Sequence, residues 1–475
     1  MDGGKHGLRA CALGAVLLGV LLVGMVSDAG AWATITVNSL ADSGKPGICT
    51  LRDAITAANT MTPTNGCIAG KGHDTIKFSE TGTIKLAATL PEVTDSQLTI
   101  NGPAKPGITI DGGGKVQVMQ VAAGVILNLN KLTITNGSNN IGAGGGIINF
   151  GILTVSNNTF SMNASIHSDG GGIANSGALT VSDSIFSGNA ARGFGGSILN
   201  EGTLTVTNSA LSGGGAFDSG GGILNANPAT LIVTSSTFSG NNAHIGGGIF
   251  NLGTLAMTNS TLSRNGAFFF GAGVGGGIFN SGTMTVTNST FSGNTAETEG
   301  GGIFNELNAG SVTLKNTILA SSSGGNCSGT IGDAAYNISD DGSCGFTAVG
   351  SLNNTDPMLD PAGLANNSGP IQTIALLLGS PAIDAIPLDS CTDQDGNPLT
   401  TDQRGFPRPD ASEQVCDIGA YEFQDFAGTP GTMNCQGVSV SALVHQFRNI
   451  KAAASALRFP SVEALQAAIT AFCRA

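Results

Sequence analysis

Gly220-Gly221-Gly222-Ile223-Leu224-Asn225 is one copy of a phrase that recurs through the middle of this 475-residue chain. A short apolar run follows each copy, and a turn such as Phe238-Ser239-Gly240-Asn241 follows the run. The copies are 25 to 29 residues apart, and an asparagine stands two positions after each isoleucine. The isoleucines are Ile147, Ile173, Ile198, Ile223, Ile249, Ile278 and Ile303. Self-similarity at a period of this size predicts a solenoid.

The pattern inside one repeat indicates strands. Apolar residues alternate with small polar ones, as in Leu179-Thr180-Val181, which places two apolar side chains on one face of a strand. Glycine and asparagine fill the corners, where a positive φ is needed. Three short strands and three corners in about 25 residues predict one coil of a right-handed parallel β-helix, so we expect an all-β fold. A single coil buries too little apolar surface to fold alone, which is why the coils must stack.

The N-terminus has the features of a secretory signal peptide. Lys5 and Arg9 precede an apolar run over residues 12–26, and Ala31-Trp32-Ala33 fits a small-x-small cleavage site. We therefore predict a signal peptide over residues 1–33. A membrane anchor is the less favoured alternative because the run is short. The mature protein is expected to be exported, secreted or held at the cell surface, without a transmembrane span.

Nine cysteines support export. Removal of Cys11 with the signal peptide leaves eight, which allow 105 pairings, and none shows the CxxC spacing of a zinc site. Proximity along the chain favours neighbour pairing. The expected disulfides are Cys49 with Cys67, Cys327 with Cys344, Cys391 with Cys416, and Cys435 with Cys473.

The composition excludes one class of partner. Charged residues make up 11% of the chain, and the formal net charge is −13. Nucleic-acid binding requires a basic stripe that can neutralise phosphates, so an acidic chain of this kind argues against it.

A short helix is expected near the mature N-terminus, where Leu51, Ala54, Ile55 and Ala58 follow helical spacing. Such a helix can cover the open end of a solenoid. The motif around it, residues 49–55, resembles the CSLREA-domain family of bacterial exported proteins, with Asp53 in place of the signature glutamate. The resemblance implies an exported surface protein.

The regular repeats resemble those of polymorphic outer-membrane proteins, in which GG-aliphatic-Ile and Phe-x-x-Asn motifs alternate. Farther on, Asp402-Gln403-Arg404-Gly405 and residues 416–422 stand in the order found in the choice-of-anchor Q region of bacterial β-helix surface proteins, which this part of the chain closely resembles. The expected organisation is a signal peptide (1–33), an N-terminal cap (34–72), a β-helix (73–350, regular at about 141–320), a choice-of-anchor-Q-like region (351–423) and a small helical tail (424–475).

The asparagines that follow the isoleucines should form ladders, because buried amides must find partners between coils. The rare charged residues lie just before the GGGI phrase and should line one edge of the rod. Asp169 and Asp218, two coils or roughly 9.6 Å apart, are weak candidates for a catalytic carboxylate pair, with Arg192 as the basic residue. The alternative is that this corner is simply the solvated one.

Two further groups are candidate sites. Phe268, Phe269 and Phe270 lie in the longest repeat and could stack on a sugar, with His244 and Arg192 nearby, or could fold back over their own coil. Asp393, Asp395 and Asn397 place oxygen atoms at alternate positions, as in calcium loops, although no glutamate closes the loop at position twelve. Calcium is the one cofactor that the sequence raises.

The sequence thus predicts an exported β-helix protein that acts as a binding or adhesion module for a polysaccharide or a cell-surface component. The alternative is a carbohydrate-active enzyme, either a pectate-lyase-like lyase or a glycoside hydrolase. An enzyme should show convergent carboxylates and a base in one groove, whereas a binding module should show only scattered polar residues.

Overall fold

The structure is a computed structural model that describes residues 32–474 except 105–106, 141, 269, 411–413, 425–432 and 457–458. Of the predicted signal peptide, only Trp32 and Ala33 belong to the described residues. Among the helices that the structure describes, none is long and apolar enough to cross a membrane.

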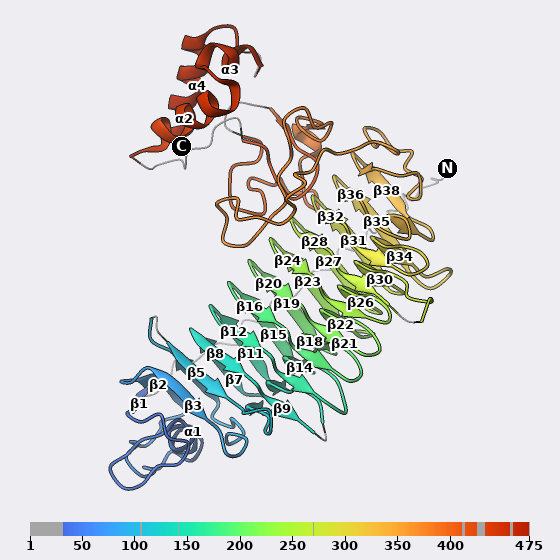
Figure 1. Ribbon diagram of the computed structural model, residues 1–475. Coiled ribbons are helices and arrows are strands. Elements are labelled where there is room, and N and C mark those ends of the chain that lie inside the picture. Colours follow the sequence, from blue (N-terminus) through green and yellow to red (C-terminus); the bar gives the residue numbers. More distant parts are fainter. Residues whose placement is uncertain are drawn as a thin grey trace, which may run out of the picture.

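The chain winds into a right-handed parallel β-helix, as the repeats predicted, and its coils stack along one axis (Figure 1). Successive coils pair in register, so that Ile223 lies between Ile198 and Ile249. Four sheets run along the axis, one more than the three expected. The additional sheet consists of two-residue strands, which are too short to show an alternating pattern in the sequence.

Each sheet collects one strand from each coil. The 12-stranded sheet contains β1 (Ala33–Val37), β2 (His73–Phe78), β4 (Gln97–Asn101), β7 (Ile126–Asn130), β11 (Ile152–Ser156), β15 (Ala178–Ser182), β19 (Thr203–Thr207), β23 (Thr230–Thr234), β27 (Thr254–Thr258), β31 (Thr283–Thr287), β35 (Ser311–Lys315) and β38 (Gly332–Ala335). The 9-stranded sheet contains β6 (Met119–Val121), β10 (Ile147–Asn149), β14 (Ile173–Asn175), β18 (Ile198–Asn200), β22 (Ile223–Asn225), β26 (Ile249–Asn251), β30 (Ile278–Asn280), β34 (Ile303–Asn305) and β37 (Cys327–Ser328).

The other two sheets complete the coils. The 11-stranded sheet contains β3 (Gly82–Lys85), β5 (Ile108–Asp111), β8 (Leu132–Thr135), β12 (Thr159–Ser161), β16 (Ile185–Ser187), β20 (Ala210–Ser212), β24 (Thr237–Ser239), β28 (Thr261–Ser263), β32 (Thr290–Ser292), β36 (Ile318–Ala320) and β39 (Ile338–Ser339). The 7-stranded sheet contains β9 (Ser138–Asn139), β13 (Ala164–Ser165), β17 (Ala190–Ala191), β21 (Gly215–Ala216), β25 (Asn242–Ala243), β29 (Gly266–Ala267) and β33 (Thr295–Ala296).

Inward side chains of like type stack on one another. Phe160 and Phe186 lie face to face, with their ring centroids 4.7 Å apart. The asparagine ladder is confirmed: Asn200 Nδ2 donates to Asn225 Oδ1 at 2.8 Å, and Asn225 Nδ2 donates to Asn251 Oδ1 at 2.8 Å. Each buried amide thereby finds partners in the next coil, as burial of a polar group requires.

The predicted cap helix is α1 (Leu51–Thr60), and Thr50 caps its N-terminus by accepting a hydrogen bond from the Asp53 N–H. All four predicted disulfides are present: Cys49–Cys67, Cys327–Cys344, Cys391–Cys416 and Cys435–Cys473. Beyond the last coil, the choice-of-anchor-Q-like region folds back along the outside of the solenoid, next to the later strands of the 11-stranded sheet (Figure 1).

This region contains little regular structure, namely the 3-10 helix η1 (Leu388–Ser390) and the antiparallel pair β40 (Ile386–Pro387) and β41 (Val415–Cys416). The tail is helical, as predicted, and comprises α2 (Cys435–Phe447), α3 (Ile450–Ala456) and α4 (Val462–Arg474). The three tail helices share a small hydrophobic core of their own, which includes Leu443, Leu465 and Ile469.

Candidate functional site

A groove runs along the outer face of the 11-stranded sheet. Its floor consists of outward side chains that repeat from coil to coil, such as Thr159, Ile185 and Ala210 in one row and Ser212 and Ser239 in the next. Two adjoining hollows of about 460 and 480 Å³ share Asp183 and Ile185 and make the groove continuous. Because it spans the five steps from β5 to β24, the groove is about 24 Å long.

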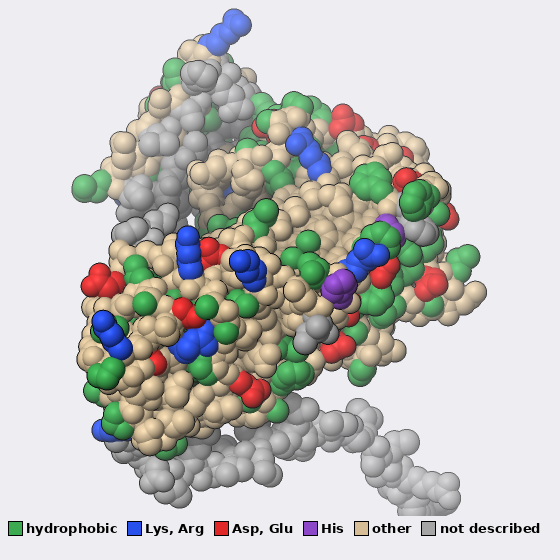
Figure 2. All heavy atoms as spheres, turned by 60° about the horizontal axis from the view of Figure 1, so that its bottom comes forward, with side chains coloured by type: hydrophobic (Ala, Val, Ile, Leu, Met, Phe, Trp, Pro, Cys, Tyr) green, Lys and Arg blue, Asp and Glu red, His purple; other side chains and the backbone are tan. Residues whose placement is uncertain are grey.

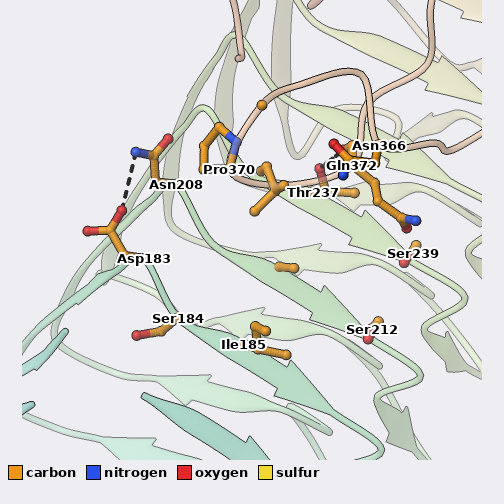
Figure 3. Close-up of a pocket in the computed structure, with 13 residues that line it drawn as sticks. Asp183, Ser184, Ile185, Asn208, Ser212, Thr237, Ser239, Asn366, Pro370 and Gln372 are labelled. Carbon is orange, nitrogen blue, oxygen red and sulfur yellow. Dashed lines mark hydrogen bonds between the residues drawn. The ribbon is translucent and has the colours of Figure 1, made fainter. Parts of the chain in front are cut away.

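One side of the groove is formed by corner residues that precede the strands of this sheet. Lys131, Asn157, Asp183 and Asn208 occupy equivalent corners, and all four have a positive φ. Asparagine and aspartate tolerate this conformation better than most residues do. The tight corner turns their polar side chains toward the groove, where the Asn208 amide donates to Asp183 Oδ1 at 3.3 Å (Figure 3).

A loop of the choice-of-anchor-Q-like region closes the groove at β24. Asn366, Gly369, Pro370, Ile371 and Gln372 line the hollow opposite Asp183 and Asn208 (Figure 3). We call this loop, residues 366–372, the end wall. It touches the sheet where the Thr237 hydroxyl donates to the Gln372 carbonyl oxygen at 2.8 Å.

The end wall rests on a buried cluster of charged residues. Arg404 donates to Asp402 Oδ2 at 2.7 Å and to the Glu422 carbonyl oxygen at 2.5 Å, and its guanidinium lies 3.6 Å from the centre of the Tyr421 ring. Arg408 donates to Glu422 Oε2 at 2.8 Å and to Asn259 of the solenoid at 3.1 Å. Buried charges of this kind are tolerated only when they are paired and hydrogen-bonded.

Burial raises the pKa of Glu422 to about 7, although the nearby Arg408 acts in the opposite direction. Burial also raises the pKa of Asp417, and the adjacent Glu422 charge adds to the rise. The Arg408–Glu422 ion pair favours an ionised Glu422, but desolvation of two neighbouring carboxyl groups outweighs it. Both carboxyl groups therefore hold a proton more readily than exposed carboxyl groups do.

The groove offers polar contacts instead of a catalytic pair of acids. Among the described residues that line the two hollows, Asp183 supplies the carboxylate and Lys131 the amine, whereas the others are hydroxyl, amide, backbone or small apolar groups. A glycoside hydrolase requires two carboxyl groups on opposite sides of the scissile bond. The described lining thus offers one carboxylate, one amine and a series of hydroxyl and amide groups as possible contacts.

The predicted pair of Asp169 and Asp218 is not aligned. Asp169 precedes the glycines of its coil at the position that Phe194 and Ser219 occupy in the next two coils, so Asp218 is one residue out of register. Asp169 Oδ1 accepts a hydrogen bond from the Phe194 N–H at 2.7 Å, which accounts for its orientation. The two carboxylates therefore do not occupy equivalent positions of their coils, contrary to the alignment on which the predicted pair was based.

The same edge instead carries a row of stacked cationic and aromatic side chains. The Arg192 guanidinium lies 4.7 Å from the centre of the Phe217 ring, and the rings of Phe217 and His244 are 4.4 Å apart. Figure 2 shows Lys/Arg and histidine side chains next to hydrophobic ones on this face of the molecule. We call Arg192, Phe217, His244 and Phe268, which follow the short strands of successive coils, the stacked edge.

Phe268 is half exposed and Phe270 is 97% exposed, whereas Phe269 lies outside the described residues. The loop that carries them is held by Glu297, whose carboxylate accepts hydrogen bonds from the N–H groups of Gly271, Ala272 and Gly273. Phe270 is thus presented to solvent on a braced loop, whereas the half-exposed Phe268 lies against Gly266 of its own coil.

The predicted calcium ligands form a closed turn. Asp393 Oδ1 accepts from the N–H groups of Asp395 and Asn397 at 2.9 Å, and the Asn397 amide donates to Asp393 Oδ2 at 3.1 Å. Burial acts to raise the pKa of Asp393, but these hydrogen bonds outweigh it and lower the pKa. Nowhere in the described part of the chain do three His, Cys, Asp or Glu side chains come together as a metal site.

The groove was missed in the sequence because its end wall comes from far along the chain. Gln372 meets Thr237 across 135 residues, and no local pattern predicts such a contact. The signal that could have been used is the repeated corner Asn or Asp followed two residues later by an outward residue, as in Asp183-Ser184-Ile185 and Asn208-Ser209-Ala210.

The sequence matches no known family model and no curated protein. Among solved structures, the crystal structure of pectate lyase Pel9A is similar to this chain, with a TM-score of 0.42 and 14% sequence identity. The alignment covers 83% of this chain and 98% of that chain.

Proposed function

We propose that the protein is an exported binding module that holds an extended polysaccharide chain in the groove of the 11-stranded sheet. The continuous groove over six coils, from β5 to β24, carries this proposal. Hydroxyl and amide groups recur along it about every 4.8 Å, so a polymer with repeating hydroxyl groups can form the same kind of contact in each coil.

Two features support a glycan over a peptide as the ligand. The strands cross the groove, so a peptide lying along it could not add to a sheet edge through its backbone. Apart from the half-exposed Ile185, the floor is built from Thr, Ser and Ala, and it does not form the deep apolar pockets that anchor peptide side chains.

Export is supported by the disulfides. Four disulfide bonds close in one chain, and such bonds persist mainly in oxidising compartments outside the cytosol. We therefore place the protein outside the cell or at its surface, in agreement with the motif resemblances at both ends of the β-helix.

The test is binding of the full chain to homogalacturonan, xylan, β-glucan and chitin fragments. Ala210→Arg places a long side chain on the groove floor and should reduce the affinity for the bound glycan at least ten-fold. Ala178→Arg, on the outward face of β15 in the 12-stranded sheet, is the matched control and should bind normally. Equal binding by both variants would exclude the groove.

The stacked edge is a second candidate surface for the same class of ligand, because aromatic faces stack on sugar rings and Arg192 can donate to hydroxyl or carboxylate groups. Changing Phe268 and Phe270 to Ser should leave the melting temperature nearly unchanged, since both rings are exposed. A loss of binding in this variant, with Ala210→Arg binding normally, would move the site to the edge.

The enzyme alternative is tested by measuring whether the protein cleaves the polysaccharide. Release of new chain ends from any of these polysaccharides, abolished by Asp183→Asn while binding persists, would identify Asp183 as a catalytic acid and replace the binding proposal. Unchanged polysaccharide length in the presence of tightly bound protein is the outcome we expect.

A further inference from the structure

The row of side chains on the groove floor changes abruptly from exposed to buried. Ile185 is 48% exposed, Thr237 only two coils farther on is 3% exposed, and Thr261 is fully buried. The groove therefore does not run the full length of the sheet. It stops where the end wall and the segment behind it cover the continuing floor.

The covering contacts are specific. Gln403 Nε2 donates to the Thr237 hydroxyl at 2.8 Å, and the Thr261 hydroxyl donates to Gln403 Oε1 at 2.5 Å. Farther along the same row, the Ala420 N–H donates to the Thr290 hydroxyl at 3.0 Å. A ligand chain could not continue along the floor past Thr237 without breaking these buried hydrogen bonds, each of which would then leave an unpaired group.

The end wall is braced and not free to swing aside. Ala365 and Thr373 pair across its base, with N–H to carbonyl distances of 3.0 and 3.1 Å. Gly369 packs so closely on Arg404 that an added Cβ would lie 2.9 Å from the arginine Cβ. Arg404 is in turn fixed by Asp402 and Tyr421, so opening of the wall would expose a buried ion pair.

From this geometry we propose that the groove receives the end of a polysaccharide chain, with the terminal sugar unit against Asn366, Pro370 and Gln372. The inference rests on the proposed function and makes it more specific. The two amide side chains can donate to and accept from the hydroxyl groups that only a terminal unit leaves free, and Pro370 offers an apolar face for the ring. The protein therefore recognises chain termini and does not coat the length of a polymer.

The test measures how many protein molecules bind per chain. Homogalacturonan, xylan and β-glucan are separated into short and long fractions, and binding of the full-length protein is titrated by calorimetry. We expect the same molar ratio of protein to chain for short and long fractions of the glycan that binds. A ratio that rises in proportion to chain length would overturn end recognition but leave the proposed function standing, whereas no binding to any glycan would refute the proposed function itself.

Chemical blocking of the ends gives an independent readout. Borohydride reduction of the reducing terminus, or enzymatic transfer of one unrelated sugar unit to the opposite terminus, should weaken binding at least ten-fold in one of the two cases. Unchanged affinity after both treatments would refute the inference.

A shortened wall should convert end recognition into binding along the chain. Replacing residues 366–372 with Asn-Gly retains a two-residue turn between Ala365 and Thr373, and long chains should then take up several protein molecules each. A molar ratio that stays at one would contradict the role of the wall. If this variant fails to fold, Pro370→Gly combined with Gln372→Gly trims the wall without shortening it, and loss of the sensitivity to end blocking is then the expected result.

Discussion

Three glycines and an isoleucine decide the shape of most of the repeated coils, and the coil around Ile223 shows why. Gly220 has a φ of +70°, which side chains disfavour, and an added Cβ on Gly221 or Gly222 would lie 2.4 to 2.5 Å from a backbone atom of the next coil. The chain can therefore turn the corner and approach its neighbour closely. Ile223, directly after this corner, is fully buried between Ile198 and Ile249.

Ile223→Asp should prevent folding, because it buries an unpaired carboxylate in the middle of the stack at a cost on the order of 4 kcal/mol or more. The matched control is Ile232→Asp, whose side chain is 42% exposed on the outer face of β23 and should change stability by only about 0.5 kcal/mol. Thermal unfolding followed by circular dichroism distinguishes the two. A folded Ile223→Asp variant with a normal melting temperature would contradict the stacking of Ile223 between the inward-facing isoleucines of the two adjacent coils.

The buried carboxyl groups make docking of the choice-of-anchor-Q-like region dependent on pH. The folded pKa of Glu422, about 7, lies above its ordinary value of 4.5, so the folded protein binds more protons than the unfolded chain between these values. The stability contributed by Glu422 is therefore complete below pH 4.5 and is lost as the pH rises through 7. The pKa of Asp417 is also raised, so the stability that Asp417 contributes is likewise lost as the pH rises.

We expect this region to become less stable by on the order of 1–3 kcal/mol as the pH rises from 4.5 to 7. Hydrogen exchange at the amides of Ile418 and Gly419, which donate to Ala382 and Asn316, reports its local opening. Glu422→Gln is the control and should flatten the dependence, since it removes the titrating group. Exchange that slows as the pH rises, after correction for the intrinsic rate, would reverse the predicted sign.

At the scale of single elements, the local sequence pattern was sufficient to predict a feature wherever the residues that form it lie within one repeat. The strands that begin at Ile223 and Thr230 follow from alternation, and α1 follows from helical spacing with Thr50 as its cap. The two-residue strands of the fourth sheet were missed because Gly215-Ala216 shows no period. The asparagine ladder was predictable since its partners occupy equivalent positions in adjacent coils.

The candidate site was less predictable because it depends on side-chain direction and on distant contacts. The spacing of Asp169 and Asp218 implied a pair, but one residue of register separates them. The end wall is fixed by Arg404 and Gln403, whose partners lie up to 167 residues away in the chain. The sequence does contain the row of corner residues that forms one side of the groove. The stacking of Arg192 on Phe217 could be recognised only after the two coils had been aligned residue by residue.

The helical tail should depend on its disulfide. Its core is small, and Cys435–Cys473 closes a loop with a sequence separation of 38 between the first and last helices. In the chain-entropy model, such a loop contributes about 4 kcal/mol, which is most of the stability that a domain of this size can have. Cys435→Ser together with Cys473→Ser should therefore lose the helical circular dichroism signal of the tail, while the β-helix melts as before. A tail that remains helical without the bond would show that its core is sufficient.

At the scale of the whole molecule, the solenoid and the region that folds back on it have different kinds of interior. The regular coils bury mainly aliphatic and aromatic residues together with uncharged asparagine, serine and threonine, whereas the folded-back region buries Arg404 and Arg408 together with several carboxyl groups. The solenoid is stabilised by the same kind of contact between each pair of adjacent coils, so the number of coils can vary. The folded-back region is attached by specific partners such as Asn259 and Asn316, so its position along the axis is fixed.

Removal of one complete coil should therefore leave a folded protein. Deletion of residues 174–198 joins Ile173 to Leu199, and the register between Ile173 and Ile198 means that Asn200 then takes the place of Asn175 in the ladder. The contacts of the folded-back region begin at Ser236 and are not touched. Since one coil interface is lost and the others reform, the melting temperature should fall by only a few degrees.

The groove of this variant is shorter by about 4.8 Å and lacks Asp183 and Ile185, so glycan binding should weaken while the fold persists. The control deletion removes residues 174–185, about half a coil, and joins Ile173 to Phe186. It places strands of different sheets in register, leaves inward side chains facing solvent, and should give insoluble protein. A full-coil deletion that misfolds as badly as the half-coil deletion would show that the coils are not equivalent units, because stacking in register predicts opposite outcomes for the two.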